Sequence, residues 1–135
     1  MNNPLTTLRV IVFVFFLSMT ANSYGQSKKE LIVGKWQFQS FISDSRGSDI
    51  SAEETAMIKD ANKKNEGMVV IFTNDNKFRS EQKAGMKVNN SSGKYSLSGN
   101  DGLVIMGDTS KILQLDKFNL KLYHEGRPVV VFKRI

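Results

Sequence analysis

Cysteine is absent from the 135 residues, and histidine occurs once, at His124. Without thiols the chain can form neither a disulfide scaffold nor a thiolate zinc site, and it offers no cysteine nucleophile or lipid-modified cysteine. A single histidine excludes a multi-histidine metal centre and leaves little room for a Ser-His-Asp triad. These two shortages remove most well-marked enzyme chemistries, and we predict neither a metal nor a cofactor.

Motifs of phosphate binding and hydrolysis are also missing. The chain has no P-loop, no glycine-rich dinucleotide motif and no nucleophile elbow. Its acidic residues fall on expected turns, on an expected helix or on outward strand faces, as Glu81 does, so no inward carboxylate pair is available for acid–base work. The sequence therefore predicts a protein that is not an enzyme.

The positive charge is modest and dispersed. Nineteen Lys and Arg residues stand against thirteen Asp and Glu, which gives a formal net charge of +6. Basic and acidic residues alternate, and like charges run no further than pairs such as Lys63-Lys64. Nucleic-acid binding requires a clustered basic stripe, so we expect no nucleic-acid partner. The charge favours solubility and at most a weak attraction to anionic surfaces.

A short hydrophobic run stands near the N-terminus. Residues 1–25 contain no acidic residue, and Val10–Leu17 is wholly apolar. This run is too short to span a bilayer, which requires roughly 20 apolar residues, and it is typical of a secretory signal peptide. Small residues precede Gln26 at the −1 and −3 positions. We predict that residues 1–25 are a signal peptide cleaved before Gln26. An uncleaved membrane anchor is the alternative.

Cleavage would leave residues 26–135 as the mature chain, which we expect to be one domain located in the periplasm or outside the cell. We expect no stable membrane insertion of this domain. Ser51 and Glu54 form a capping-box pattern at the start of a helix predicted over residues 51–65. Before the helix, alternation of apolar and polar residues from Gly34 to Ile42 predicts one strand.

After the helix, about seven short apolar runs are separated by turns rich in Gly, Asn and Asp. The expected strands are 68–73, 77–83, 93–97, 103–106, 111–115, 118–124 and 129–135, with a break at Asn89–Ser92. Sequential hairpins form a meander, and a meander of about eight strands avoids unpaired edges by closing into a barrel. We therefore predict an all-β fold: an antiparallel, about eight-stranded meander closed into a barrel, with one helix between the first two strands. An open sandwich is the alternative.

Short motifs follow one another along the strands. In chain order they are Gly34–Trp36, the hairpin Val70–Phe78 with its Lys-Phe pair, Gly93–Tyr95, and the final basic pair Lys133–Arg134. With this set, residues 31–135 resemble the bacterial secreted lipocalin-like domains. Asn76 stands where the family's hairpin turn usually has glycine. The resemblance implies a lipocalin-like barrel.

The resemblance also implies a structural role for Gly34, Trp36 and Arg134, since a Trp and a basic residue close the base of such barrels. The first and last strands of a closed barrel are neighbours, and running antiparallel they bring Trp36 and Arg134 to the same end. A guanidinium over an indole face stabilises a protein by about 0.5–2 kcal/mol. A ligand platform at Trp36 is the alternative interpretation.

The barrel interior is the candidate binding site, because an eight-stranded barrel is either filled by side chains or holds one small ligand. Alternation predicts these inward positions: Trp36, Phe38, Ser40, Val70, Phe72, Phe78, Ser80, Tyr95, Leu97, Leu120, Leu122, Val130 and Phe132. Aromatic residues gather near Trp36, and polar or flexible residues gather at the opposite end, as is typical of a small-molecule cup. The predicted ligand-binding residues are Ser40, Ile42, Met57, Ser80, Gln82 and Tyr95. Tyr95 is also interpreted as a core aromatic with its hydroxyl at a strand end, in preference to a catalytic phenol, and His124 is interpreted as a solvated surface residue.

Two functions follow from these patterns. The first is an exported, non-enzymatic, lipocalin-like protein that binds one small apolar or amphipathic ligand in its barrel. The second is a protein-interaction module, such as an inhibitor or accessory subunit, with a solid barrel core. The predicted helix at 51–65 discriminates between them: a lid over an open cup favours the first function, and packing over a closed base favours the second.

Overall fold

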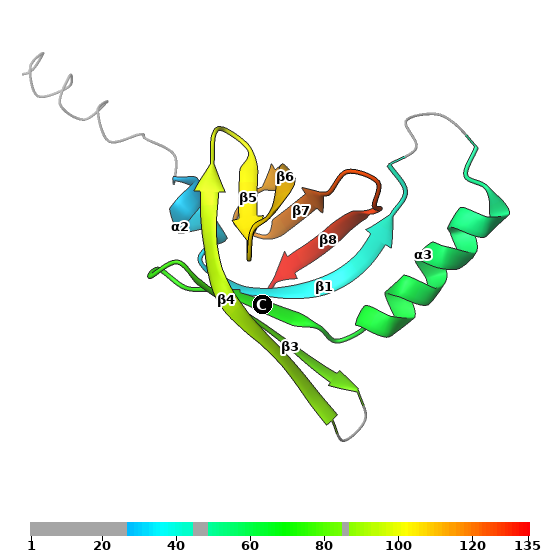
Figure 1. The fold of residues 1–135 in the computed structure, drawn as a ribbon, viewed down its shortest axis with the longest axis horizontal. Helices are drawn as coiled ribbons and strands as arrows, with labels where there is room; N and C mark the ends of the chain where they lie inside the picture. The colour runs from blue at the N-terminus through cyan, green and yellow to red at the C-terminus, as the bar shows by residue number, and fades with distance from the viewer. Residues whose placement is uncertain (1–26, 45–48, 85–86) are drawn as a thin grey trace, which may run out of the picture.

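Eight antiparallel strands close into a barrel in a computed structural model that describes residues 27–44, 49–84 and 87–135 (Figure 1). The elements are α2 (Lys28–Ile32), β1 (Gly34–Ile42), α3 (Ala52–Asn65), β2 (Val69–Phe72), β3 (Lys77–Ala84), β4 (Lys87–Ser98), β5 (Gly102–Ile105), β6 (Asp108–Leu115), β7 (Asn119–Tyr123) and β8 (Val129–Arg134). The strands pair in sequence order, and β8 returns to pair with β1. The predicted closed meander and its helix between the first two strands are confirmed.

Large apolar side chains fill the barrel at the end where β1 begins. Trp36, Phe72, Leu103 and Leu120 are fully buried there, together with Ile32 from α2. The alternation of the sequence predicted most of this core correctly. The predicted inward residues that are buried or packed against it are Trp36, Phe38, Val70, Phe72, Phe78, Tyr95, Leu97, Leu120, Leu122, Val130 and Phe132.

A β-bulge in β1 interrupts the alternation. The register between β1 and β8 shifts between Phe38 and Ser40, so that Phe41 lies opposite Val130. The Phe41 ring packs on Phe38 with their centroids 5.1 Å apart. A bulge adds one residue to a strand and exchanges the two faces beyond it. The prediction that Ser40 points inward therefore fails at this position.

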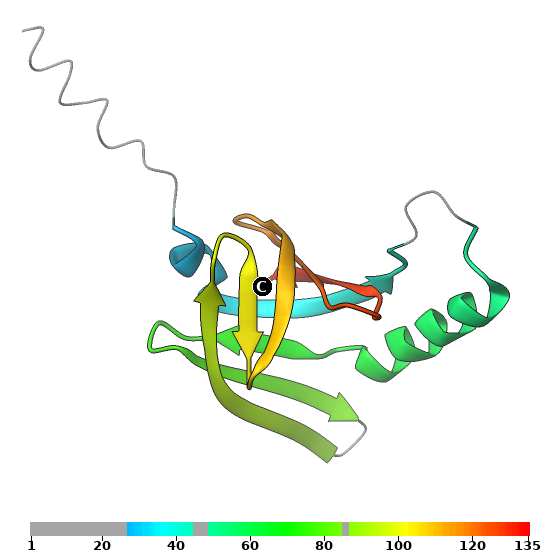
Figure 2. The ribbon, with the colours of Figure 1, turned by 45° about the horizontal axis from the view of Figure 1, so that its top comes forward.

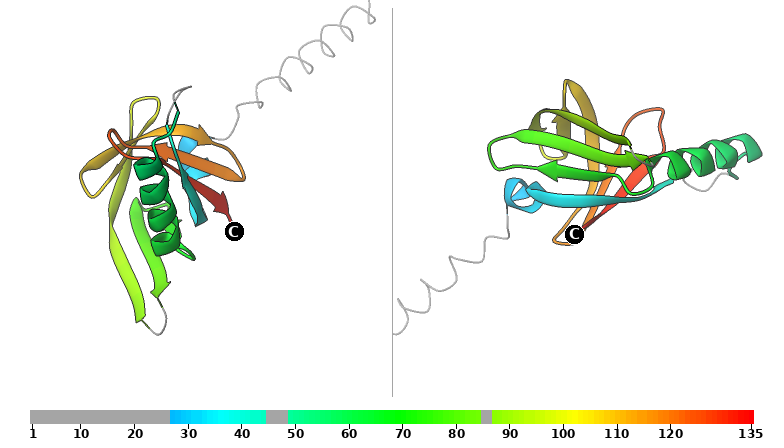
Figure 3. Two further views of the ribbon diagram at one scale, coloured as in Figure 1. Left: turned by 90° about the vertical axis from the view of Figure 1, so that its right-hand side faces the viewer. Right: turned by 90° about the horizontal axis from the view of Figure 1, so that it is seen from below.

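The predicted break at Asn89–Ser92 is wrong, because β4 runs through it from Lys87 to Ser98. The first part of β4 pairs with β3 and its last four residues pair with β5. Beyond Glu81, where the pairing of β3 with β2 ends, the β3–β4 pair projects from the barrel as a two-stranded arm (Figures 1 and 3). A full-length partner strand overrides the poor intrinsic strand preference of Asn and Ser.

Two helices lie at different places on the barrel, as the tilted view of Figure 2 shows. The short helix α2 precedes β1 and was not predicted; Ser27 caps it by accepting from the Glu30 N–H at 3.2 Å. The helix α3 is the predicted one, and the Ser51 hydroxyl accepts from the Glu54 N–H at 3.1 Å. No residue of α3 is buried, so α3 packs lightly against the strands beside it.

Candidate functional site

The barrel has a closed end, where β1 begins and β8 ends, and an open end, where β8 begins. At the closed end the Trp36 ring nitrogen donates to the Ile32 carbonyl oxygen at 2.8 Å. The Arg134 guanidinium carbon lies 4.3 Å from the centroid of the Trp36 ring. Its Nη1 donates to the Val33 carbonyl oxygen at 2.8 Å. The cation–π pair therefore holds the α2–β1 corner across the barrel base.

Gly34 leaves room for this arrangement. A Cβ placed on Gly34 would lie 2.2 Å from Arg134 Nη1, and the residue has φ +139°, a conformation that L side chains rarely adopt. Arg134 cannot easily give way, because its Nε also donates to the Lys117 carbonyl oxygen at 2.8 Å and Nη2 donates to Leu31. The structure thus brings Gly34, Trp36 and Arg134 together at the closed end.

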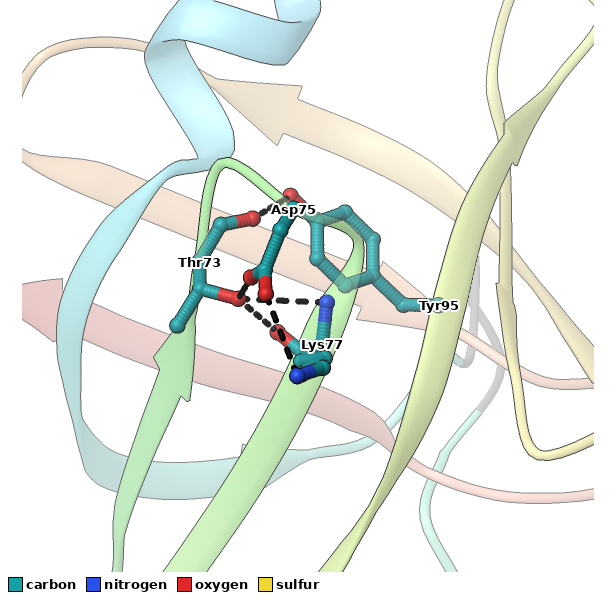
Figure 4. Close-up of polar contacts among 4 residues, drawn as sticks. All are labelled: Thr73, Asp75, Lys77 and Tyr95. Carbon is teal, nitrogen blue, oxygen red and sulfur yellow. Dashed lines mark hydrogen bonds and ion pairs between the residues drawn. The ribbon is translucent and has the colours of Figure 1, made fainter.

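Tyr95 also lies at the closed end, where its hydroxyl group holds the β2–β3 turn in position (Figure 4). Its hydroxyl donates to the Thr73 carbonyl oxygen at 2.7 Å and accepts from Lys29 Nζ at 3.0 Å. The Thr73 hydroxyl accepts from the Lys77 N–H at 3.1 Å, and Asn76 takes φ +62° in the turn. Tyr95 therefore links α2 to the turn, and its ring is buried in the core.

The open end contains a pocket of about 460 Å³. Its lining residues are Phe41, Phe78, Ile105, Met106, Asp108, Ser110, Leu122, His124, Arg127, Pro128 and Val130. Apolar side chains of the barrel interior form its floor, since Leu122 and Phe78 are buried and Val130 packs on the core. The pocket is therefore a cup whose floor is the packed core, and this core separates it from the closed end of the barrel.

Polar groups surround the mouth of this cup. His124 Nδ1 lies 3.0 Å from the Thr109 carbonyl oxygen, which fixes the ring at the rim. Arg127 is exposed, and its side chain has no ion-pair partner among the residues that the structure describes. Asp108 and Ser110 add a carboxylate and a hydroxyl. The combination of an apolar floor and a polar rim is typical of small-molecule sites.

None of the six predicted ligand-binding residues lines this pocket. Ser40 and Ile42 lie opposite Val131 and Val129 on the other face of β1, because of the bulge. Ser80, which lies opposite Val70 and Ser91, and Gln82, whose amide donates to the Lys64 carbonyl oxygen, lie on β3. Met57 lines a separate hollow of about 410 Å³ between α3 and the β7–β8 turn, and Tyr95 lies at the closed end.

Ile105, Ser110 and His124 form part of the pocket and were missed as site residues. The same period-two pattern that placed Leu120 and Leu122 inward also places Ser110 inward, because Ser110 lies opposite the fully buried Leu103. His124 gives no such signal, since its place at the rim follows from barrel closure. Alternation applied to β5 and β6 would have found the first two residues.

The helix α3 lies beside the open end and contributes no residue to the pocket. Asn62 holds it there: its Oδ1 accepts from the Phe41 N–H at 2.6 Å, and its Nδ2 donates to the Phe41 carbonyl oxygen at 3.5 Å. The phenyl ring of Phe41 lines the pocket. Thus α3 neither caps the cup nor packs on the base; it supports one wall from outside, and the base is covered by α2.

Within residues 27–44, 49–84 and 87–135, no three acidic or histidine side chains come together as metal ligands would. Among the helices described for this chain, none is long and apolar enough to cross a membrane.

Comparison with known proteins identifies the family to which this barrel belongs. No curated protein sequence matches the chain. The crystal structure of a lipocalin-like protein from Bacteroides uniformis superimposes with a TM-score of 0.55 and 17% sequence identity, covering 77% of this chain and 98% of that one; at this identity the likeness shows the fold. The model of the lipocalin-like domain family matches residues 32–122, which is more than half of the chain. The protein therefore belongs to the lipocalin-like domain family.

Proposed function

We propose that this protein is an exported, non-enzymatic binding protein that holds one small apolar or amphipathic molecule in the open-end pocket. The observation that carries the proposal is the cup of about 460 Å³ with buried Leu122 and Phe78 in its floor. This volume lies within the range of about 300–1,000 Å³ that small-molecule pockets occupy. The ligand enters from the open end, since Trp36 and Arg134 fill the other.

The rim favours an amphipathic ligand over a purely apolar one. An apolar body removed from water in the cup gains roughly 25 cal/mol for each Å² of buried apolar surface. A polar head left at the mouth meets His124, Arg127 and Ser110, and it avoids the cost of burying an unpaired polar group. The proposed ligand therefore points its apolar part toward Leu122 and its polar part toward the β7–β8 turn.

A substitution that fills the cup tests this proposal. Ser110 points into the pocket, whereas Thr109 is exposed and lies opposite Val104, on the other face of β6. Titration with the apolar fluorophore N-phenyl-1-naphthylamine should give saturable one-to-one binding to the wild type and to Thr109→Phe. Binding to Ser110→Phe should be at least tenfold weaker, about 1.4 kcal/mol. Equal affinities of the two variants for the fluorophore would show that it does not bind in the open-end pocket.

Export is a separate part of the proposal. The apolar run Val10–Leu17 and the small residues before Gln26 support it, and they lie outside the described residues. Expression of the full chain in a bacterial host, followed by N-terminal sequencing of the periplasmic protein, should give a chain that begins at Gln26. Recovery of the full-length chain in the membrane fraction would favour the retained-anchor alternative.

The protein-interaction module stays a second candidate because of α3. No residue of α3 is buried, Met57 in this helix is 67% exposed, and Ile50 shortly before it is 46% exposed. Apolar side chains on a lightly packed helix are available to a protein partner. An intact barrel that binds neither the fluorophore nor any co-purified small molecule would favour this second function.

A further inference from the structure

The closed end carries lysines and exposed apolar side chains that neither the plug nor the pocket uses. We define the basic face as Lys28, Lys35, Lys117, Phe118, Lys133 and Ile135, all of which are exposed. The Phe118 side chain is 64% exposed and that of Ile135 is 62% exposed. Such exposure is unusual for a large aromatic side chain in a domain of this size, so the face calls for an explanation of its own.

These residues come from different parts of the sequence, and backbone hydrogen bonds join three of those parts at the closed end. The Ile135 N–H donates to the Lys35 carbonyl oxygen at 3.1 Å. The Arg134 N–H donates to the Phe118 carbonyl oxygen at 2.9 Å. These bonds join β1, β8 and the β6–β7 turn, so Lys35, Ile135 and Phe118 leave neighbouring backbone positions. Lys117 Nζ lies 5.7 Å from the centroid of the Phe118 ring.

No ion pair among the described residues joins a lysine of this face to a carboxylate. The ion pairs among the described residues join Lys64 to Asp60, Lys77 to Asp75, Arg79 to Glu81 and Lys111 to Asp101. None of them includes a lysine of the basic face. Asp116 is close in sequence, but its Oδ1 accepts from the Phe118 and Asn119 N–H groups at 2.8 Å. Glu30 in α2 is the other nearby acid, and no ion pair joins it to Lys28.

We infer that the basic face docks on an anionic phospholipid surface. Lysines near an anionic bilayer each contribute about 1 kcal/mol of attraction, and exposed aromatic and aliphatic side chains insert at the level of the headgroups. Phe118 and Ile135 lie among the lysines as such insertion requires. A nucleic acid would use the lysines but would leave Ile135 without a partner, so the apolar tips favour lipid.

The pocket opens at the opposite end of the barrel from the basic face. With the basic face on a membrane, the mouth of the pocket, at His124 and Arg127, would point into solvent. The inference itself rests on the closed end and does not depend on the proposed ligand.

Vesicle co-sedimentation of the full chain tests the inference. The probes are vesicles of pure phosphatidylcholine and vesicles with about 30% phosphatidylglycerol. Lys35→Glu/Lys117→Glu/Lys133→Glu reverses the basic face, and Lys59→Glu/Lys63→Glu/Lys83→Glu is a control of equal net charge with exposed lysines elsewhere. Every variant keeps the same N-terminal segment. The measured quantity is therefore the ratio of binding to the two kinds of vesicle.

We expect the wild type and the control to bind anionic vesicles at least tenfold better than neutral ones, with the preference decreasing as salt is raised. The basic-face variant should lose this preference. Each lysine charge that is removed should weaken binding to anionic vesicles by about fivefold or more. Phe118→Ala should keep the salt dependence and bind a few-fold more weakly. Circular dichroism confirms that each variant is folded.

Three results would overturn the inference. The wild type could show no preference for anionic vesicles. The two triple variants, both folded, could bind anionic vesicles equally well, which would assign the attraction to net charge alone. A DNA duplex could bind more tightly than anionic vesicles at the same salt, with loss in the basic-face variant, and the face would then be a nucleic-acid surface.

Discussion

Trp36 joins the core of the barrel to the polar contacts that close it. The indole is fully buried, its ring nitrogen is satisfied by the Ile32 carbonyl oxygen, and Arg134 covers one face. Truncation of Trp36 to alanine would remove buried apolar surface and also the aromatic ring on which the Arg134 guanidinium packs. We expect Trp36→Ala to lower the free energy of unfolding by about 3–5 kcal/mol, measured by urea denaturation. Phe118→Ala, at an exposed aromatic, should change it by less than about 0.5 kcal/mol. An unchanged melting temperature for Trp36→Ala would contradict this account of the closed end.

Gly34 allows a sharper experiment on the same contacts. In Gly34→Ala the new methyl group meets a guanidinium that carbonyl groups hold in place, and the positive φ adds strain, so we expect a loss of about 1–3 kcal/mol in unfolding free energy. Gly126→Ala is the matched control, because Gly126 also has a positive φ but nothing lies within 4 Å of the added carbon. If both variants lose the same stability, the close approach of Arg134 has no energetic importance.

Among single residues, the sequence predicted the closed end better than the open end. Trp36 and Arg134 could be paired because closing a meander makes the first and last strands neighbours. Ser40 and Ile42 were misplaced, since a bulge that exchanges the faces of β1 leaves no mark in a period-two pattern. The rim residues His124 and Arg127 come together because the barrel closes and because the β7–β8 turn folds back over its mouth. An apolar–polar pattern along one strand contains no information about either feature.

At the scale of elements, α3 depends on a few polar contacts because it buries no residue. The Asn62 amide group satisfies the N–H of Phe41 next to the bulge. Asn62→Ala should cost about 1–2 kcal/mol and increase amide hydrogen exchange throughout α3. Asn65→Ala is the control, since the bond of that side chain among the described residues goes to the Ala61 carbonyl oxygen within the helix. Equal exchange in the two variants would mean that Asn62 does not dock the helix.

The β6–β7 turn should respond to acid. The Phe118 N–H, with the Gln114 amide group and the Asn119 N–H, lowers the pKa of Asp116 from its ordinary 3.8 to about 2. A folded pKa below the unfolded one stabilises the protein above about pH 4, and this stabilisation is lost as the pH falls from about 4 through 2.

In Asp116→Asn the decrease in stability over that pH range should be smaller. Urea midpoints at pH 2, 3, 4 and 7 measure the difference between the two proteins. Parallel pH profiles for the wild type and the variant would show that Asp116 is not the responsible group.

The elements themselves were largely predictable, with two instructive failures. The helix α3 was predicted because Ser51 and Glu54 give a local capping signal that the fold keeps. The same Ser-x-x-Glu spacing at Ser27 and Glu30 marks α2, and it was overlooked beside the predicted signal peptide. The continuity of β4 through Asn89–Ser92 depends on pairing with β3, a non-local interaction that local preference does not contain.

For the whole molecule, the two ends of the barrel are built differently. The closed end is filled by Trp36, Arg134 and the α2 contacts, and it carries the basic face. The open end keeps a cup that Phe41, Leu122 and their neighbours line. Ser110 lines the proposed ligand site and does not belong to the buried core cluster, so a substitution there should change binding more than folding. Ser110→Phe is therefore expected to keep a cooperative unfolding transition.

Native mass spectrometry of the protein isolated from the cells that produce it tests the central claim most directly. The account predicts a wild-type mass that exceeds the chain mass by one small molecule, which is released on denaturation, and Thr109→Phe should retain the same molecule. Ser110→Phe should have the mass of the bare chain. A wild-type protein that is folded, free of any ligand and without an internal void in its solved structure would contradict the claim that this barrel is a small-molecule container.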